Sequence, residues 1–144
     1  MPQSLARNTI HLIFSTKHRE PLIAPALDRR LFAYMAGTLN DIKCPALMIG
    51  GVADHVHVMF VLARTVSLSD AVETVKKSSS KWMKLNGVPR FYWQGGYGAF
   101  SVSHSHVSRV AAYIAAQEEH HRKKTFGQEF EVLVKKYGLE WRED

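Results

Sequence analysis

The sequence predicts a single domain of mixed α/β (α+β) class. Residues 8–16 alternate between apolar and polar side chains, and residues 52–62 form a largely apolar run; both patterns are typical of strands. Residues 28–40 and 67–85 carry apolar side chains at helical spacing. The chain has 144 residues, which is enough for one hydrophobic core and too few for two domains. We therefore expect residues 1–144 to form one domain that contains both strands and helices.

Further strands are expected on either side of the 67–85 helix. Pro45 opens a strand that runs to Ile49, and the pair Gly50-Gly51 predicts a bend or bulge before the next strand. Strands joined so closely are expected to be antiparallel neighbours. The aromatic and glycine-rich stretch 91–100 predicts a loop that leads into a fourth strand, ending near Ser103. Its rings either stack on unpaired bases or close the edge of the core.

The helix predicted over residues 67–85 begins at Ser67, which with Asp70 resembles a capping pair. Three lysines recur at i, i+4 and i+7 on its outer face: Lys77, Lys81 and Lys84. Such a face is either simply solvated or follows a phosphate backbone. A last short helix is expected over residues 126–137, followed by a frayed tail over residues 138–144.

The chain is basic and contains one cysteine. Nineteen Lys and Arg residues against thirteen Asp and Glu residues give a net charge of +6, which favours nucleic acid first and anionic membrane second. A lone Cys44 excludes a disulfide framework and a thiolate zinc site, so we expect it to be a small buried apolar residue. No signal peptide is recognisable and the apolar run 46–53 is too short to span a bilayer, which predicts a cytoplasmic protein without a membrane partner.

Two histidines stand one residue apart in a predicted strand. Alternate side chains of a strand point to opposite faces, so His55 and His57 share one face. The other face is apolar and belongs against a core: Val56, Val58, Phe60 and Leu62. Two imidazoles placed in this way can hold one metal ion or one phosphate. The alternative is a pair of half-exposed histidines on the surface of the sheet.

A row of polar side chains runs along the helix predicted after Ser103. On a helical wheel, five residues fall within roughly 40° of Tyr113: His106, Arg109, Gln117, His120 and Lys124. The apolar residues of this helix gather toward the opposite side. A tyrosine on an amphipathic helix is commonly a residue at the core edge, but the donors and cations beside Tyr113 favour a functional role.

These residues suit phosphoryl chemistry if the histidine pair and Tyr113 face one another across a cleft. His55, His57 and the amide oxygen of Gln117 could hold one divalent cation with open positions, and that cation would polarise a phosphoryl oxygen. Ligand type alone does not name the metal, since such a set suits Mn²⁺ or Mg²⁺ less neatly than zinc. Tyr113 would be the nucleophile, conserving the energy of the broken phosphodiester in a covalent ester. Gln117 is expected to lie on the same helix as Tyr113.

The candidate contacts to DNA are mostly basic side chains outside this set. Lys17 and Arg19 belong to a small basic cluster at the end of the first strand. The alternative interpretation of this cluster is a solvated turn. The remaining candidates come from the two long helices and the segment after Tyr113: Lys77, Lys81, Arg109, His120 and Lys124. For His120 and His121, contact with DNA, contact with the metal and a place on a basic surface all stay open.

The combination resembles a known family, the single-tyrosine HUH transposases (Y1 transposases) of the smallest bacterial insertion sequences, with their relatives associated with repetitive extragenic palindromes (REP). The matching pieces lie between about Asn8 and Phe130. They are the first strand with Ser15-Thr16-Lys17-His18-Arg19, the box Asp54-His55-Val56-His57, the stretch 96–103, and Tyr113-Ile114-Ala115-Ala116-Gln117 followed by His120-His121 and Phe126. An isolated HxH is weak evidence, but HxH on a strand followed by YxxxQ on a helix is specific in so short a chain.

The resemblance implies a ferredoxin-like sandwich around an antiparallel sheet, with the histidine pair on a central strand. It implies a homodimer that recognises a DNA hairpin near the end of an insertion sequence and cleaves single-stranded DNA using Mg²⁺ or Mn²⁺. By the match, His55, His57 and Gln117 become metal ligands and Tyr113 the nucleophile. The product would be a 5′-phosphotyrosine intermediate and a free 3′-OH. In such dimers the tyrosine helix of one subunit can complete the active site of the other.

Three other functions stay open on the sequence alone. A host-adopted relative would nick palindromic repeats by the same chemistry without moving an element. A non-catalytic protein would hold hairpins on the same basic, aromatic surface and need neither Tyr113 nor metal. A small metal hydrolase acting on a phosphoester would need the histidine pair but not Tyr113.

Overall fold

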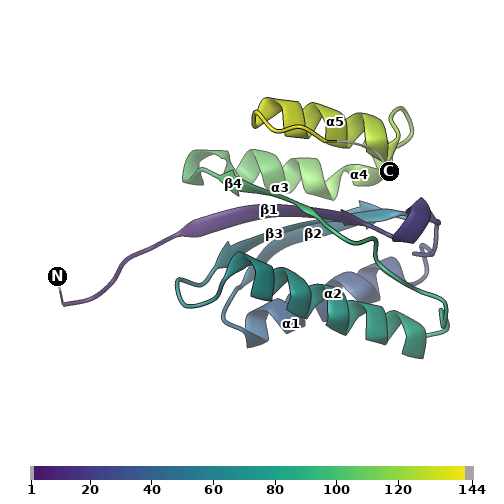
Figure 1. Ribbon diagram of the computed structural model, residues 1–144, viewed down its shortest axis with the longest axis horizontal. Helices are drawn as coiled ribbons and strands as arrows, with labels where there is room; N and C mark the ends of the chain where they lie inside the picture. Colours follow the sequence, from purple (N-terminus) through teal and green to yellow (C-terminus); the bar gives the residue numbers. More distant parts are fainter. Residues whose placement is uncertain (1, 142–144) are drawn as a thin grey trace.

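A four-stranded antiparallel sheet separates two layers of helices in the computed structural model, which describes residues 2–141 (Figure 1). The strands are β1 (Asn8–Ser15), β2 (Ala46–Val52), β3 (His55–Leu62) and β4 (Gly98–Val102). Their spatial order is β2-β3-β1-β4, and every neighbouring pair is antiparallel. The predicted antiparallel sandwich is confirmed, and the histidine pair lies on β3, an inner strand.

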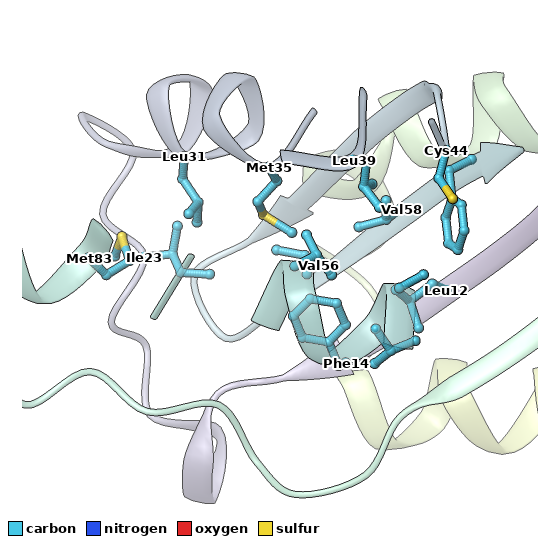
Figure 2. Packing of buried hydrophobic residues seen from close by; sticks show 14 of the residues in the cluster. Leu12, Phe14, Ile23, Leu31, Met35, Leu39, Cys44, Val56, Val58 and Met83 are labelled. Atoms are coloured by element: carbon cyan, nitrogen blue, oxygen red, sulfur yellow. The ribbon is translucent and has the colours of Figure 1, made fainter. Parts of the chain in front are cut away.

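The first helical layer consists of α1 (Asp28–Asp41) and α2 (Leu68–Leu85). It covers the apolar face that alternation predicts for β1 and β3 (Figure 2). The buried residues of this core include Leu12, Phe14, Val56 and Val58 from the sheet and Leu31, Met35 and Leu39 from α1. Cys44 is fully buried in the same cluster, as expected for a small apolar residue. The hydroxyl of Ser67 accepts a hydrogen bond from the backbone N–H of Asp70, which caps α2 as predicted.

The second helical layer lies on the opposite face of the sheet (Figure 1). It consists of α3 (Val107–Ala115), α4 (Gln117–His120) and α5 (Phe126–Lys136), with the short turns η1 (Lys17–Arg19) and η2 (His104–His106) leading from β1 and into α3. Two small apolar clusters anchor it, one around Phe100, Phe126 and Phe130 and one around Met59 and Ile114. Buried polar residues of this face lie outside both clusters, among them His11, His55, His57, Gln117 and Glu129. Of the predicted tail, residues 142–144 lie outside the described residues.

The prediction of a bend at Gly50-Gly51 is wrong. Both glycines lie within β2, the register shift falls between Ala46 and Met48, and the turn to β3 follows Val52. Instead, the missing side chains of these glycines let neighbouring backbone segments lie close to β2. A Cβ on Gly50 would stand 2.3 Å from the backbone oxygen of Ile114, so its absence lets α3 pack directly on β2.

Gly50→Ala is therefore expected to destabilise the protein by about 1–3 kcal/mol, because the added methyl group must displace the α3 backbone. Gly37→Ala in α1 is the matched control: nothing lies within 4 Å of its Cβ position, and the change should stabilise the helix by about 0.5–1 kcal/mol. Urea unfolding followed by circular dichroism measures both. Equal stability of Gly50→Ala and the wild type would contradict this account of the α3–β2 contact.

Candidate active site

His55 and His57 are completely buried beneath the second helical layer. The alternative of two half-exposed histidines on a sheet surface is therefore wrong. The Nδ1 atom of His55 lies 2.8 Å from Oδ1 of Asp54, in the turn before β3. The Nδ1 atom of His57 shares a 2.8 Å hydrogen bond with Nε2 of His11 on the neighbouring strand β1. Both imidazoles are thus oriented through Nδ1, which leaves Nε2 to face the helices.

Glu129 of α5 lies at the centre of the site. Its Oε1 atom is 3.0 Å from Nε2 of His57 and 3.4 Å from Nε2 of His55. The same atom lies 3.1 Å from Nε2 of His121. Its other oxygen, Oε2, accepts hydrogen bonds from the hydroxyl of Tyr113 and from the amide nitrogen of Gln117. One carboxylate therefore joins the imidazoles to the tyrosine.

Tyr113 points from α3 toward the histidines of its own chain. Its ring centroid lies 5.8 Å from that of His57 and 6.5 Å from that of His11. The ring of His120 stacks on it at 4.6 Å. Burial and then the hydrogen bond to Glu129 raise the pKa of the Tyr113 hydroxyl above its ordinary value, so without a cation the side chain is a neutral phenol.

Gln117 is almost fully buried and contacts both halves of the site. Its amide oxygen lies 3.1 Å from Nε2 of His55, and its amide nitrogen donates to Glu129. The expectation that Gln117 shares one helix with Tyr113 is wrong, because α3 ends at Ala115 and the backbone of Ala116 leaves the helical region at φ −100° and ψ 21°. The two side chains reach Glu129 from different helices.

The charges of the site follow from these contacts. Burial would raise the pKa of Glu129, but hydrogen bonds from His55 and His57 hold it well below its ordinary range, so the carboxylate is ionised. Burial would lower the pKa of His55, but hydrogen bonds to Asp54 and Glu129 outweigh burial and raise it. Burial lowers the pKa of His57, and together with the neighbouring His57 it lowers that of His11 to about 3. A neutral His57 thus donates through Nε2 to Glu129 and accepts at Nδ1 from His11.

The donor set fits a divalent cation. Ligand atoms of His55, His121 and Glu129 all lie within 4.8 Å of one another. His57 and Gln117, which the sequence predicts as ligands beside His55, contact the same carboxylate. Glu129, His11 and the role of Asp54 are absent from the predicted set. The sequence does contain a signal for a buried role of Glu129. This carboxylate stands on the apolar face of its helix, three residues after Phe126, and a carboxylate buried there needs a polar partner. The apolar residues of that face are Phe126, Phe130, Leu133 and Val134.

The predicted DNA contacts are scattered around the molecule. Three of the predicted contacts are exposed and lie either on the face of the sheet that carries the site or at its edge: Lys17, Arg109 and Lys124. Two others, Lys77 and Lys81, lie on α2, on the opposite face of the sheet from α3 and Tyr113 (Figure 1). Arg19 lies over the rings of Phe126 and Trp141, and His120 stacks on Tyr113.

Two cavities flank the cluster. One of about 840 Å³ is lined by residues that include Arg19, Tyr97, Phe130 and Trp141. Another of about 690 Å³ is lined by residues that include Asp54, His121 and Lys124. The mixture of cations and aromatic rings in these walls is suited to phosphates and bases.

Comparison with known families bears on this site directly. The family model described as "Transposase IS200 like" matches residues 4–117 of the chain. The chain belongs to the IS200-like transposase family. Transposases of this family are metal-dependent enzymes that cleave nucleic acid. The matched segment contains His55, His57 and Tyr113 and ends at Gln117, whereas His121 and Glu129 follow it.

Two solved structures share the fold. A protein of Deinococcus radiodurans R1, described as a candidate transposase, has a TM-score of 0.65 and 19% identity, covering 77% of this chain and 91% of its own. A REP-associated tyrosine transposase bound to a REP hairpin has a TM-score of 0.63 and 14% identity, covering 99% of this chain and 90% of its own. No curated protein matches the sequence. Among residues 2–141, no helix is long and apolar enough to cross a membrane.

Proposed function

We propose that this IS200-like transposase cleaves and rejoins single-stranded DNA at hairpin-marked element ends, using Tyr113 as the nucleophile. One observation carries the proposal: the hydroxyl of Tyr113 and the buried pair His55 and His57 share the carboxylate of Glu129. A nucleophile and metal-capable imidazoles brought together in this way are what tyrosine-mediated phosphoryl transfer requires. Family membership over residues 4–117 supports the same assignment.

In this proposal His55, His57 and Gln117 hold Mg²⁺ or Mn²⁺, which supplies charge stabilisation on a phosphoryl oxygen of the scissile phosphate. The oxygen of Tyr113 forms a bond to phosphorus as the bond to the 3′ oxygen breaks, which leaves a 5′-phosphotyrosine and a 3′-OH. The proton lost by the phenol balances the proton gained by the 3′ oxygen. Glu129 orients Tyr113 through its hydrogen bond, and its low pKa makes it a weak base.

The partner in this proposal is a DNA hairpin joined to a single strand, bound by a homodimer. The solved REP-associated transposase that covers 99% of this chain is bound to a REP hairpin, which supports the partner by analogy. The net charge of +6 favours a polyanion. Lys17, Arg19, Arg109, His120 and Lys124 are the candidate contacts nearest the site, and Lys77 and Lys81 would require DNA to reach the α2 layer.

A second candidate function is favoured by the same structural match. A host-adopted relative of the REP type would nick palindromic repeats without mobilising an element. Its chemistry at Tyr113 would be identical. The two functions differ in their substrate, so excision and joining of an element flanked by hairpins would separate them.

The test of the proposed function uses labelled single-stranded oligonucleotides that carry candidate hairpins, incubated with protein and Mn²⁺ or Mg²⁺. A denaturing gel reports DNA linked covalently to the protein. We expect a metal-dependent adduct with the wild type and none with Tyr113→Phe, because phenylalanine lacks the attacking oxygen. Cleavage that persists in Tyr113→Phe would indicate a metal hydrolase. Tight hairpin binding with neither adduct nor cleavage would indicate a non-catalytic binding protein.

A further inference from the structure

Glu129 is a buried carboxylate whose position is fixed by the packing of α5. Its side chain is 5% exposed. Phe126 and Phe130, on either side of it in the helix, pack in the apolar cluster with Ile13 and Phe100. A capping box between Thr125 and Gln128 fixes the start of the helix. The carboxylate is therefore held against the sheet rather than placed there by a flexible chain end.

Atoms of the kinds that ligate metal ions surround this carboxylate. Nδ1 of His121 donates to the backbone oxygen of Lys124 at 2.7 Å, which turns Nε2 toward Oε1 of Glu129, 3.1 Å away. The amide oxygen of Gln117 likewise faces Nε2 of His55, whose other nitrogen already faces the carboxylate of Asp54. Ring nitrogens and carboxylate or amide oxygens at such distances share either a proton or a metal ion.

The spacing matches that around a metal ion. Octahedral coordination at 2.0–2.1 Å places neighbouring ligand atoms roughly 3 Å apart. Oε1 of Glu129 lies 3.0 Å from Nε2 of His57, 3.1 Å from that of His121 and 3.4 Å from that of His55. We propose that Glu129 is itself a ligand of the divalent cation, with His121 as a further nitrogen donor. This inference rests on the proposed metal-assisted function.

A carboxylate changes the chemistry of the site. Two imidazoles and an amide form a neutral set, whereas Mg²⁺ and Mn²⁺ favour anionic oxygen ligands. Glu129 supplies that charge through Oε1, while Oε2 contacts Tyr113 and Gln117. The nucleophile is thereby tied to the metal site through a single side chain. Since the family match ends at residue 117, α5 adds a ligand from outside the matched segment.

The test measures Mn²⁺ binding by the full chain without DNA, using titration calorimetry and the electron paramagnetic resonance signal of free Mn²⁺. Glu129→Gln keeps the shape of the side chain and removes its charge. We expect its Kd for Mn²⁺ to rise by at least about tenfold. Glu131→Gln, on the exposed face of the same helix where Glu131 pairs with Lys135, is the matched control and should bind as the wild type does.

Two results would overturn the assignment. Unchanged Mn²⁺ affinity in Glu129→Gln would show that the carboxylate is not a ligand. Tighter binding would show that Glu129 competes with the cation for the histidines. If thermal melting shows that Glu129→Gln is unfolded, Glu129→Asp replaces it: the shorter acid should weaken binding if it is a ligand, and wild-type affinity would refute the proposal.

The same experiment separates this inference from the proposed function. A wild type that binds no Mn²⁺ and forms no covalent adduct would refute both. A wild type that forms a metal-dependent adduct, with equal Mn²⁺ affinity in Glu129→Gln, would refute the ligand role of Glu129 alone.

Discussion

His57→Ala is expected to reduce Mn²⁺-dependent cleavage and adduct formation on the order of 10³-fold or more. The imidazole is completely buried and contacts Glu129 through one nitrogen and His11 through the other. Its loss removes a proposed ligand and the hydrogen-bond partner of the buried His11, while Glu129 keeps its contacts with Tyr113 and Gln117. Cleavage rates of a labelled hairpin substrate at saturating Mn²⁺ measure the effect.

The controls separate lost chemistry from lost folding. Unpaired buried groups each cost about 1–3 kcal/mol, so thermal melting must show that His57→Ala is folded at the assay temperature. His57→Gln keeps hydrogen-bonding capacity in the cavity and should be folded but similarly inactive. His104→Ala, at an exposed histidine of η2, should cleave at the wild-type rate. Near-normal cleavage by folded His57→Ala would remove the histidine pair from the mechanism.

Local periodicity predicts most of the fold because each element is stabilised along one face. The alternation around Leu12 and Phe14 and the helical spacing around Leu31 and Met35 both correspond to one buried core. The misplaced bend at Gly50 has a different origin. Its requirement for glycine comes from the backbone of Ile114, which is 64 residues away (114 − 50) and invisible to any local pattern.

The residues of the candidate site also fall into two groups, those that a local pattern identifies and those that it does not. His55, His57, Tyr113 and Gln117 are identifiable because their spacing on a strand and a helix is a local pattern, and the structure brings all four together. Glu129 is 72 positions from His57, and no local pattern in the sequence identifies His57 as its partner. Its place in an apolar stripe is the one local sign. The lysine row on α2 shows the converse, since regular spacing defines a face but not the side of the sheet on which that face lies.

Mixing Tyr113→Phe with His57→Ala is expected to restore no cleavage. Within one chain, Tyr113 reaches Glu129, and Glu129 reaches His57, so each subunit of the proposed homodimer would carry a complete site. The close approach of Ile114 to Gly50 fixes the tyrosine helix against β2 of its own chain. Each variant in the mixture would then lack one essential group in every site, whatever the arrangement of subunits.

A tyrosine helix that acts across the dimer would restore a defined fraction of the cleavage activity in the mixture. If α3 crosses to the partner, random mixing makes half of the dimers mixed, and each mixed dimer contains one site with both native groups. Activity would recover to about a quarter of the wild-type value. Recovery of that size, with each variant alone inactive, would mean that the tyrosine helix exchanges between subunits and that the contact between Ile114 and Gly50 forms across the dimer. No recovery would mean that cleavage needs only the site within one chain, with dimerisation left to position the two DNA ends.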